Sequence, residues 1–512
     1  MVKINKQIKL GFYFNYLNIA IGFAVTLLLT PLTIRVLGKV EYGLFGLIGS
    51  IVGYLHLLEF GIGDTIVRYV AKFTAEHQDE IKVKRFVGLI FILYCAVALF
   101  LLLIGTVLFF SLDRIFGKSI TTPEQLISAQ TMLVILVITS AIGLFGTIFS
   151  STLAGLGQIA IPRISATISW AFRIVLTILV IFYFKTSVAL TLTSAIGIIA
   201  SSMFSIAYCT LKMHVVPVFH NCEWYMLKEL FLFSLYNFAA TAMGQLYWKL
   251  GTLLAGMFLG SACVTYYDIG IQLSTFTLLI TNSFPGMFLP YATTMAVHNA
   301  SVKETTSFMS KIGRFTTTLY AGITIGFIFL GKKFICLWVG PEYEIAYWIT
   351  LIALVGSFIC RIQSGANLIL RAKNLHGFLN ICYLIAGLFN VLLSLIFMKL
   401  FGVIGLSLST AIALFLGNVL VANWYYHKKC GIDVFQFFYD VFHDKLIPYT
   451  LSAIAGFALL FLKNDSWPVF LLQGFVFASI YFSASYFFGT TAEEKDLLKS
   501  FLKKRHSEIN KV

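Results

Sequence analysis

Residues 30–73 give the clearest indication of the fold, and their sequence is TPLTIRVLGKVEYGLFGLIGSIVGYLHLLEFGIGDTIVRYVAKF. An apolar run that begins near residue 10 ends inside this segment, and a second apolar run occupies 42–60. Only a short polar link separates the two runs. Apolar runs of about 20 residues are typical of helices that cross a bilayer, and so short a link predicts that the two helices are consecutive spans.

The composition of the whole chain supports a membrane protein. Of its 512 residues, 59% are hydrophobic and 12% are charged, and the mean hydropathy is +0.89. A water-soluble domain carries about 25% charged residues, so this chain could not cover its own surface in water. The eight cysteines form no C-x-x-C pair and lie mostly in apolar runs. The sequence therefore indicates neither a disulfide framework nor a metal site, and it predicts no cofactor.

Apolar runs long enough to span a bilayer occur fourteen times along the chain. We predict spans near 10–34, 42–60, 86–111, 127–153, 164–184, 188–211, 230–257, 264–290, 314–334, 346–369, 377–398, 401–424, 447–463 and 467–488. The connections between them are too short to form an extramembrane catalytic domain. The sequence thus predicts an all-α polytopic membrane protein that acts within or across the bilayer and is not an enzyme.

The formal net charge of +15 comes from 37 Lys and Arg against 22 Asp and Glu. We find no soluble domain on which basic and aromatic residues alternate, so nucleic acid is not an expected partner. If the N-terminus is cytoplasmic, most Lys and Arg fall on the cytoplasmic side, including Arg314 at the start of the ninth predicted span. Basic residues are retained on that side of a membrane, so both termini are predicted to be cytoplasmic.

Two pairs of segments suggest an internal repeat. The stretch RVLGKVEYGLFGLIGSI after the first span is echoed by GMFLGSACVTYYDIGIQL after the seventh, each with an L-G pair that ends a span. A second echo pairs 151–165 with 367–380. Both offsets equal six spans, and an even-numbered unit returns to the same side of the membrane. The halves would therefore be parallel repeats.

The repeat predicts two six-helix bundles, over 1–212 and 213–430, followed by two additional spans and a basic cytoplasmic tail in 431–512. Two such bundles usually enclose a central cleft with a substrate site near the bilayer midplane. Several glycines early in the chain would permit close helix approach or local unwinding, or serve only as small packing residues. They are Gly46, Gly49, Gly53, Gly61 and Gly63.

The segment 30–73 also resembles the N-terminal signature of the polysaccharide flippases of the MATE-like superfamily, which carry O-antigen or capsule repeat units. That signature has an L-G-x-x-x-Y-G-x-F element, then an acidic residue, an F-G or L-G turn and an Arg-containing helix. The matching residues here are Leu37, Gly38, Tyr42, Gly43, Phe45, Glu59, Phe60, Gly61, Gly63 and Arg68. Glu59 stands where the family more commonly has Asp.

The resemblance implies a function. Members of this family translocate undecaprenyl-diphosphate-linked oligosaccharide from the cytoplasmic to the outer leaflet of the bacterial inner membrane by alternating access. The expected partners are the lipid-linked substrate, the membrane, and a polysaccharide polymerase or chain-length protein. The resemblance does not specify the glycan.

Three cations lie deepest in the predicted spans: Arg173, Lys249 and Arg361. A charge at membrane depth costs roughly 2.5–3.5 kcal/mol, so each needs a partner or water. We expect them to line the cleft and bind the diphosphate, for which Arg offers a planar fork and Lys a point charge. The alternatives are snorkelling from a span end and a structural ion pair. Arg35 and Arg68, at the outer and inner mouths, are further candidates for substrate binding, or else interfacial anchors.

Three acidic residues are candidates for ion coupling: Glu59 at the end of span two, Asp64 one turn later, and Asp268 in span eight, the corresponding span of the second half. A carboxyl shielded from water can carry a proton during alternation, so H⁺ or Na⁺ coupling is expected. For Asp64 the rival reading is an i,i+4 contact with Arg68. His56 shares a helix face with Glu59, but the sequence places no third metal ligand near them.

Tyr247 and Trp248 are candidates for stacking on sugar rings, although aromatic helix packing explains most membrane Tyr and Trp. Two other transporters remain alternatives: a MATE-type drug or cation antiporter, which should have more acids and fewer cations in its cleft, and a flippase for peptidoglycan precursor. A polysaccharide polymerase or membrane glycosyltransferase would need a long outward loop or an acidic cluster for sugar transfer, and the sequence has neither.

Overall fold

The computed structural model describes residues 6–76, 80–220, 226–282, 285–298, 300–373, 375–462, 466–492 and 494–496. In these ranges every regular element is a helix, which confirms the all-helical prediction for the part of the chain described. The α-helices are α1 (Lys6–Leu55), α2 (Ile62–Ala75), α3 (Glu80–Ile115), α4 (Pro123–Gly155), α5 (Ala160–Tyr183), α6 (Ser187–Ala207), α7 (Met226–Trp248), α8 (Leu250–Phe258), α9 (Ser261–Asn282), α10 (Leu289–Val297), α11 (Val302–Trp338), α12 (Ile345–Ile362), α13 (Ser364–Ala372), α14 (His376–Leu414), α15 (Ala422–Tyr425), α16 (Val434–Phe442), α17 (Leu446–Leu459) and α18 (Trp467–Phe488).

Among the described residues, nine helical stretches are long and apolar enough to cross a membrane. Two of them, Tyr13–Ala75 with 63 residues and Gly377–Cys430 with 54, are far longer than the roughly 20 residues that a bilayer needs. Each contains a glycine with a non-helical backbone: Gly38 at φ 77° and ψ 168°, and Gly402 at φ 58° and ψ −140°. Glycine adopts positive φ at little cost. Each stretch is thereby divided into membrane-length parts, and the chain is a multi-pass membrane protein.

The stretch after Gly38 is interrupted a second time. α1 ends at Leu55, a short 3-10 turn covers His56–Glu59, and α2 begins only after Phe60 (φ 52°) and Gly61 (φ 67°). The span predicted to end at residue 60 therefore breaks there and continues as α2. Positive φ is uncommon for a residue other than glycine, so Phe60 marks a strained point beside the acidic residue of the signature.

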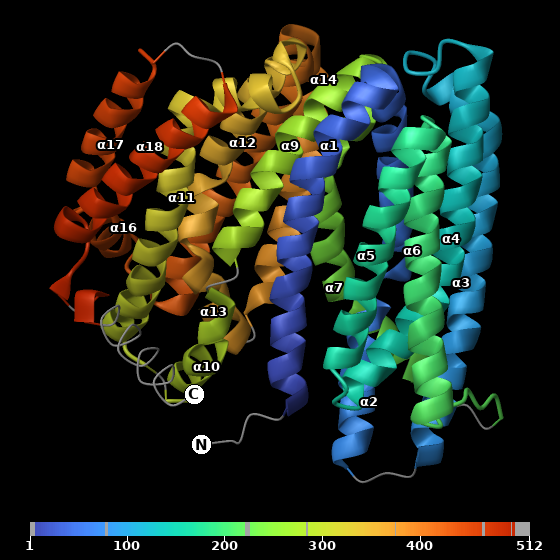
Figure 1. Ribbon diagram of the computed structural model, residues 1–512. Helices are drawn as coiled ribbons and strands as arrows, with labels where there is room; N and C mark the ends of the chain where they lie inside the picture. The colour runs from blue at the N-terminus through green and yellow to red at the C-terminus, as the bar shows by residue number, and fades with distance from the viewer. Residues whose placement is uncertain are drawn as a thin grey trace, which may run out of the picture. The chain divides into compact units, whose positions relative to one another are not determined.

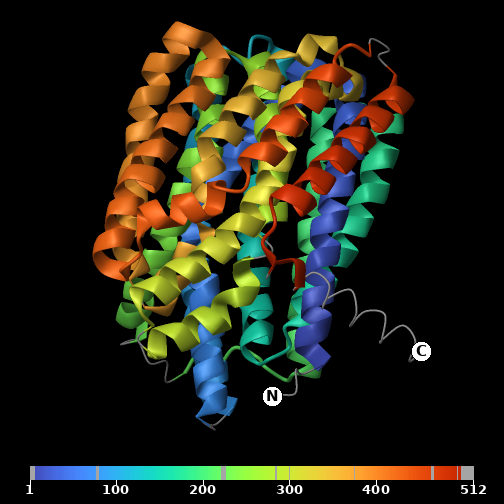
Figure 2. The ribbon, with the colours of Figure 1, turned by 90° about the vertical axis from the view of Figure 1, so that its left-hand side faces the viewer.

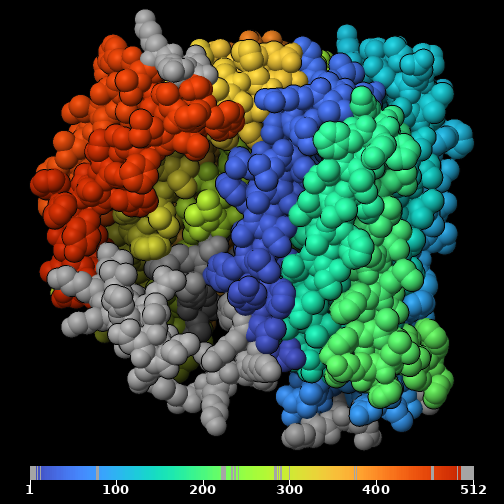
Figure 3. Space-filling view, viewed as in Figure 1, coloured from blue at the N-terminus to red at the C-terminus, as the bar shows by residue number. Residues whose placement is uncertain are grey.

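By their internal contacts the helices form two compact units. The first comprises Met1–Ile269 and Gly387–Leu406, and the second Gly270–Ala386 and Ser407–Val512. In the first unit α4 contacts α1, α2, α3, α5 and α6, and Figure 1 shows α3, α4, α5 and α6 side by side. The teal α5 lies between the blue α1 and the green α6 in Figure 3.

Small residues bring the helices of the first unit close together. A Cβ added at Gly146 of α4 would lie 2.2 Å from Oγ of Ser202 on α6, and one at Gly155 would lie 2.7 Å from Cβ of Val70 on α2. Neither position has room for a side chain. Close backbone approach at small residues is the usual way in which membrane helices pack, because lipid provides no hydrophobic drive for their association.

Two glycines of segment 30–73 serve the same purpose between α1 and the first turns of α9. A Cβ at Gly43 would lie 1.9 Å from the Ser261 carbonyl oxygen, and one at Gly46 would lie 2.2 Å from Oδ2 of Asp268. Gly49, by contrast, is exposed and would meet nothing within 4 Å. Of these three glycines of α1, two thus fix the α1–α9 contact and one does not.

In the second unit α11 contacts α12, α16, α17 and α18. A capping box opens this helix, since Ser301 and Glu304 bond reciprocally through side chain and backbone. Figures 1 and 2 show the red helices α17 and α18 beside α11. These two helices follow the end of the predicted repeat, and their packing on α11 incorporates them in the unit.

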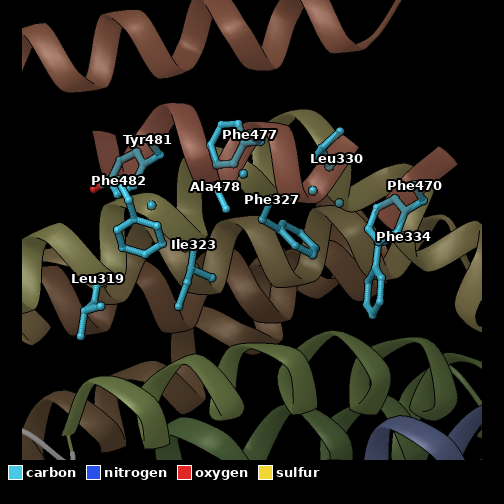
Figure 4. Close-up of a pocket in the computed structure, with 14 residues that line it drawn as sticks. Leu319, Ile323, Phe327, Leu330, Phe334, Phe470, Phe477, Ala478, Tyr481 and Phe482 are labelled. Carbon is cyan, nitrogen blue, oxygen red and sulfur yellow. The ribbon is translucent and has the colours of Figure 1, made fainter. Parts of the chain in front are cut away.

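An apolar groove with a volume of about 370 Å³ runs between α11 and α18. Phe327 and Phe334 of α11 and Phe470 and Phe482 of α18 line it with aromatic rings, as Figure 4 shows. Its one phenol, Tyr481, donates a hydrogen bond to the Thr318 carbonyl oxygen. None of the residues that line this groove is charged, so the groove is not suited to an anionic or cationic ligand.

Candidate functional site

The first unit gathers polar groups around Asp268 of α9. Thr252 of α8 donates a hydrogen bond to Oδ1 of Asp268, while Oδ2 faces Gly46 of α1. Gly251 lets α8 approach α9, because a Cβ there would lie 2.0 Å from the buried ring of Tyr267. The Asp268 carboxylate of α9 is therefore held by the Thr252 hydroxyl of α8 and packs against Gly46 of α1.

Lys249 and Tyr42 complete the surroundings of Asp268. Lys249 lies at the junction where α7 ends and α8 begins, and its positive charge acts on the Asp268 carboxylate. Tyr42 of α1 also interacts electrostatically with Asp268, and its hydroxyl is hydrogen-bonded to the Thr30 side chain. We call Tyr42, Lys249, Thr252 and Asp268 the Asp268 cluster.

Arg173 of α5 extends this cluster. Its guanidinium lies 5.2 Å from the centre of the Trp170 ring, and its charge acts on Tyr42. Tyr42 therefore interacts with an anion, Asp268, and with a cation, Arg173. The structure thus brings two of the three predicted deep cations and one of the predicted acids into a single neighbourhood.

The cations of this neighbourhood have few internal acceptors. Lys249 is exposed, although it lies between two apolar helices. Among the described residues, neither Lys249 nor Arg173 donates a hydrogen bond to a carboxylate or a carbonyl oxygen. Because a bare charge at membrane depth is costly, such cations require water or an anionic ligand.

Glu59 belongs to a different set of contacts in the same unit. It lies in the 3-10 turn before the break and accepts a hydrogen bond from the Tyr94 hydroxyl of α3 at 3.1 Å. Nε2 of the neighbouring His56 lies 3.3 Å from Oγ of Ser140 on α4. Asp64 and Arg68, which follow on α2, are exposed.

Arg35, Arg361, Tyr247 and Trp248 are the remaining predicted residues. Arg35 is exposed on α1, one turn before Gly38. Arg361 lies in the last turn of α12 in the second unit, where its charge acts on Tyr320. Tyr247 is 2% exposed, and Trp248 is partly buried at the end of α7.

Sequence reasoning missed three contributors to the cluster: Tyr42, Thr252 and Thr30. Tyr42 was visible as the aromatic residue of the signature, but its position there indicated a family and not a role. The two threonines carried no signal, because a hydroxyl in an apolar run most often bonds its own helix backbone. Only the packing of α1 and α8 against α9 assigns them.

The second unit has a charged cluster of another kind, around Arg314 of α11. Nε and Nη2 of Arg314 donate to the two carboxylate oxygens of Glu494 at 2.7 and 3.2 Å. Nη1 donates to the Asp440 carbonyl oxygen at 2.6 Å and to Oδ2 of Asp444 at 3.2 Å, and Nη2 also donates to the Gly489 carbonyl oxygen at 3.1 Å. We call this the Arg314 cluster.

Lys445, which is 1% exposed, joins the Arg314 cluster through hydrogen bonds from Nζ to the Gly489 carbonyl oxygen and the Thr318 hydroxyl. Burial, together with the nearby Arg314, lowers the pKa of Lys445 to about 8. Burial opposes the ionisation of Glu494, but its hydrogen bonds with Arg314 hold the pKa of that carboxyl below its usual range. The pKa of Asp444 is also lowered: its hydrogen bond with His443 and the charge of Arg314 outweigh burial.

Comparison with known proteins identifies the family. Residues 11–295 match the family model described as "Polysaccharide biosynthesis protein". This match spans more than half of the chain, which therefore belongs to that family. No curated protein sequence matches the chain.

Solved structures share the fold at low sequence identity. The lipid II flippase MurJ in an inward closed conformation is 16% identical with a TM-score of 0.71, covering 96% of this chain and 99% of its own. An inward-facing multidrug resistance MATE family transporter of the MOP superfamily is 14% identical with a TM-score of 0.64, covering 78% and 93%. The MATE transporter VcmN of Vibrio cholerae, in the bent form, is 15% identical with a TM-score of 0.52, covering 86% and 98%.

The family and the fold confirm the resemblance found in residues 30–73. The chain is thus a multi-pass membrane protein of the polysaccharide biosynthesis protein family, and its fold is similar to that of the lipid II flippase MurJ and of MATE transporters.

Proposed function

We propose that this member of the polysaccharide biosynthesis protein family is a flippase that moves undecaprenyl-diphosphate-linked oligosaccharide from the cytoplasmic to the outer leaflet by alternating access. The family description supports a role in polysaccharide assembly, and the fold is that of a lipid II flippase. The protein would act in the bacterial cytoplasmic membrane with both termini inside. A polymerase or chain-length protein would receive its product.

The observation that carries the proposal is the pair of cations at the Asp268 cluster. The charge of Arg173 acts on Tyr42 and that of Lys249 on Asp268, and no described carboxylate or carbonyl oxygen accepts a hydrogen bond from either cation. A diphosphate bears several anionic oxygens, for which Arg and Lys are the usual partners. Arg361, Arg35 and Arg68 would supply further contacts along the path of the head group.

The topology that we propose has fourteen spans: six in residues 1–212, six in 213–430 and two in 431–512. It is supported by the L-G pair at both echoes of the repeat, where Gly38 and Gly260 each have positive φ, at 77° and 99°. A further positive-φ glycine, Gly402, divides the long helix α14.

Ion coupling by H⁺ or Na⁺ would use Glu59, Asp64 or Asp268. Of these, Asp268 is adjacent to a substrate-binding candidate, and Glu59 lies at the broken turn between α1 and α2. Trp248, next to Lys249, is partly exposed and could stack on a sugar ring; Tyr247 could do so only after a rearrangement, because it is 2% exposed.

The likeness to the lipid II flippase makes peptidoglycan precursor a second candidate substrate. A MATE-type antiporter of drugs or cations is favoured less, because Lys249 of the Asp268 cluster and the neighbouring Arg173 are two cations for one acid. A cationic drug would be repelled by that balance.

One experiment separates these candidates. In cells that lack the protein, extracted lipids should contain an accumulated undecaprenyl-diphosphate oligosaccharide, and this lipid should lie on the cytoplasmic leaflet. Re-expression of the wild-type chain should clear it. Accumulation of peptidoglycan precursor instead would identify the second candidate. Accumulation of neither lipid, together with loss of cationic dye efflux, would contradict the flippase and favour the antiporter.

A further inference from the structure

The helix break at Phe60 is held in place by α7. Phe60 has a φ of 52°, a left-handed backbone that costs free energy for a residue with a side chain. Such a conformation persists only where its surroundings stabilise it. The Phe60 ring packs on two rings of α7, with its centroid 5.0 Å from that of Phe238 and 6.3 Å from that of Phe231. A contact with a different helix therefore stabilises the strained backbone.

After the break, α2 is joined to α7 by two hydrogen bonds. The hydroxyl oxygens of Thr65 and Ser234, both buried, lie 3.0 Å apart. The Tyr69 hydroxyl donates a hydrogen bond to Oε2 of Glu229 at 3.0 Å. The partners on α7 follow in reverse order as α2 advances, so the two helices run antiparallel. We call the contact of Phe60, Thr65 and Tyr69 with α7 the α2–α7 contact.

The opposite side of α2 packs on α4 in a different way. A Cβ at Gly155 of α4 would lie 2.7 Å from Cβ of Val70, and a Cβ at Gly63 of α2 would lie 3.3 Å from Cγ2 of Thr147. Small residues thus bring α2 and α4 into close contact, as in stable pairs of membrane helices. A hydroxyl pair, by contrast, can exchange its partner for water at a small net cost. If α2 separates from a neighbour, we therefore expect it to separate from α7.

We propose that the α2–α7 contact is a gate on the cytoplasmic side of the first unit and that the strain at Phe60 favours its opening. This inference rests on the proposed function, in whose topology α2 ends and α7 begins on the cytoplasmic side. When α7 moves away, Phe60 loses its two partner rings, and its left-handed backbone is no longer stabilised. Residues 56–61 then relax toward a helical backbone, which moves Glu59 away from the Tyr94 hydroxyl. The structure holds this gate closed.

A disulfide across the gate tests whether it must open during transport. In Thr65→Cys/Ser234→Cys the two thiols replace hydroxyls that lie 3.0 Å apart, so an oxidant should cross-link the helices. Clearance of lipid-linked oligosaccharide in cells that lack the native protein should then stop, and reduction should restore it. Each single substitution, which retains the same native cysteines, should leave clearance insensitive to the oxidant.

Thr177→Cys/Thr193→Cys is the matched control. These two hydroxyls are also buried and lie 3.1 Å apart, but they join α5 and α6 within the first unit. Their disulfide should form without loss of clearance. Clearance that continues after the gate pair is cross-linked would overturn the gate. Failure of the gate pair to cross-link under conditions that join the control pair would also overturn it.

A second measurement tests the strain and requires no transport. Thr65 is buried in the closed gate, so the rate at which a water-soluble maleimide labels Thr65→Cys in the purified full chain measures the open fraction. Mass spectrometry reads the label at position 65. Phe60→Ala and Phe60→Gly both remove the ring, but glycine adopts positive φ at little cost, so labelling should be about fivefold faster with Phe60→Ala. Phe238→Ala, which removes a partner ring, should also label faster than Thr65→Cys alone.

The two measurements fail separately. Equal labelling rates in the two Phe60 variants would contradict a role for strain, and a Phe238→Ala rate no higher than that of Thr65→Cys alone would show that α7 does not hold the gate. If the wild-type chain clears no lipid-linked oligosaccharide, the proposed function fails. Faster labelling in Phe238→Ala would then still support the gate, because this readout does not depend on the substrate.

Discussion

Arg173 and Arg314 are both arginines on apolar helices, but the protein uses their donors in opposite ways. The Arg314 guanidinium donates to the carboxylates of Glu494 and Asp444 and to two backbone carbonyl oxygens. Arg173 lies against the Trp170 ring, and none of the described residues accepts a hydrogen bond from it. The N–H donors of Arg314 are therefore bonded within the fold, whereas those of Arg173 are available to water or to a ligand.

The difference shows how to separate structural from functional charges at membrane depth. A guanidinium has five N–H donors, and one that already binds carboxylates cannot take a phosphate without breaking those bonds. An arginine on an aromatic face keeps its donors available for two phosphate oxygens. The number of cations in the spans says little by itself; the acceptors around each cation decide its role.

The strongest test removes the satisfied arginine. Arg314→Met should leave the partly buried carboxylates of Glu494 and Asp444 without this cation. Breaking a buried pair by removing one partner costs about 3 kcal/mol at the lower end of its range, which applies here because Asp444 is one-third exposed. We expect a large loss of protein from the membrane and a lower melting temperature in detergent.

Lys303→Met is the matched control for Arg314→Met. Lys303 lies on the same helix, is exposed, and its loss should leave yield and melting temperature close to those of the wild type. If Arg314→Met has the same melting temperature as this control, the Arg314 cluster does not stabilise the fold, and Arg314 and Arg173 would not differ in the way that we propose.

Arg173→Gln should have the opposite effect: transport should fall while stability is unchanged. Its melting temperature should stay near that of the wild type, because no described hydrogen bond is lost. Transport of the lipid-linked oligosaccharide should fall by at least about 10-fold, the effect of one lost charge-assisted contact of roughly 1.4 kcal/mol. Clearance of accumulated lipid in cells that lack the native protein measures the transport, and Arg173→Lys should retain part of it. Normal transport by Arg173→Gln would mean that this arginine only anchors α5 through Trp170.

The sequence predicted an all-helical membrane protein, because long apolar runs are a local signal, and it placed Arg173, Lys249 and Asp268 within such runs. It could not predict that Arg314 is buried and paired. Its acceptors lie 126 to 180 residues further along the chain, and its position at the start of a span made it look like a loop cation. Only long-range packing distinguishes the two arginines.

The helix break after Glu59 is a second feature that the sequence did not predict. The sequence ended the second span at residue 60, because the next residues include Asp64, Arg68 and Lys72. These charges lie on an amphipathic helix, α2, whose apolar face is buried at Ile66 and Val70. A count of apolar residues cannot distinguish such a helix from a loop, although its apolar spacing of three to four residues could have revealed it.

The smallest expected effect is a change of the melting temperature with pH, which tests whether the Arg314 cluster is shielded from water as its hydrogen bonds indicate. In the folded protein the pKa of Lys445 is about 8, because burial disfavours the ammonium and Arg314 repels it; its ordinary value is 10.5. Between pH 8 and 10.5 the unfolded chain therefore binds a proton that the folded protein does not, so stability rises with pH in this window. The melting temperature should increase by a few degrees relative to Lys445→Met, which lacks the titrating group. Lys428→Met, which removes an exposed lysine that lies over the Trp424 ring, should keep the increase.

If the melting temperatures of Lys445→Met and the wild type change in the same way between pH 8 and 10.5, Lys445 must reach water. The Arg314 cluster would then be as open to solvent as the cations beside Asp268.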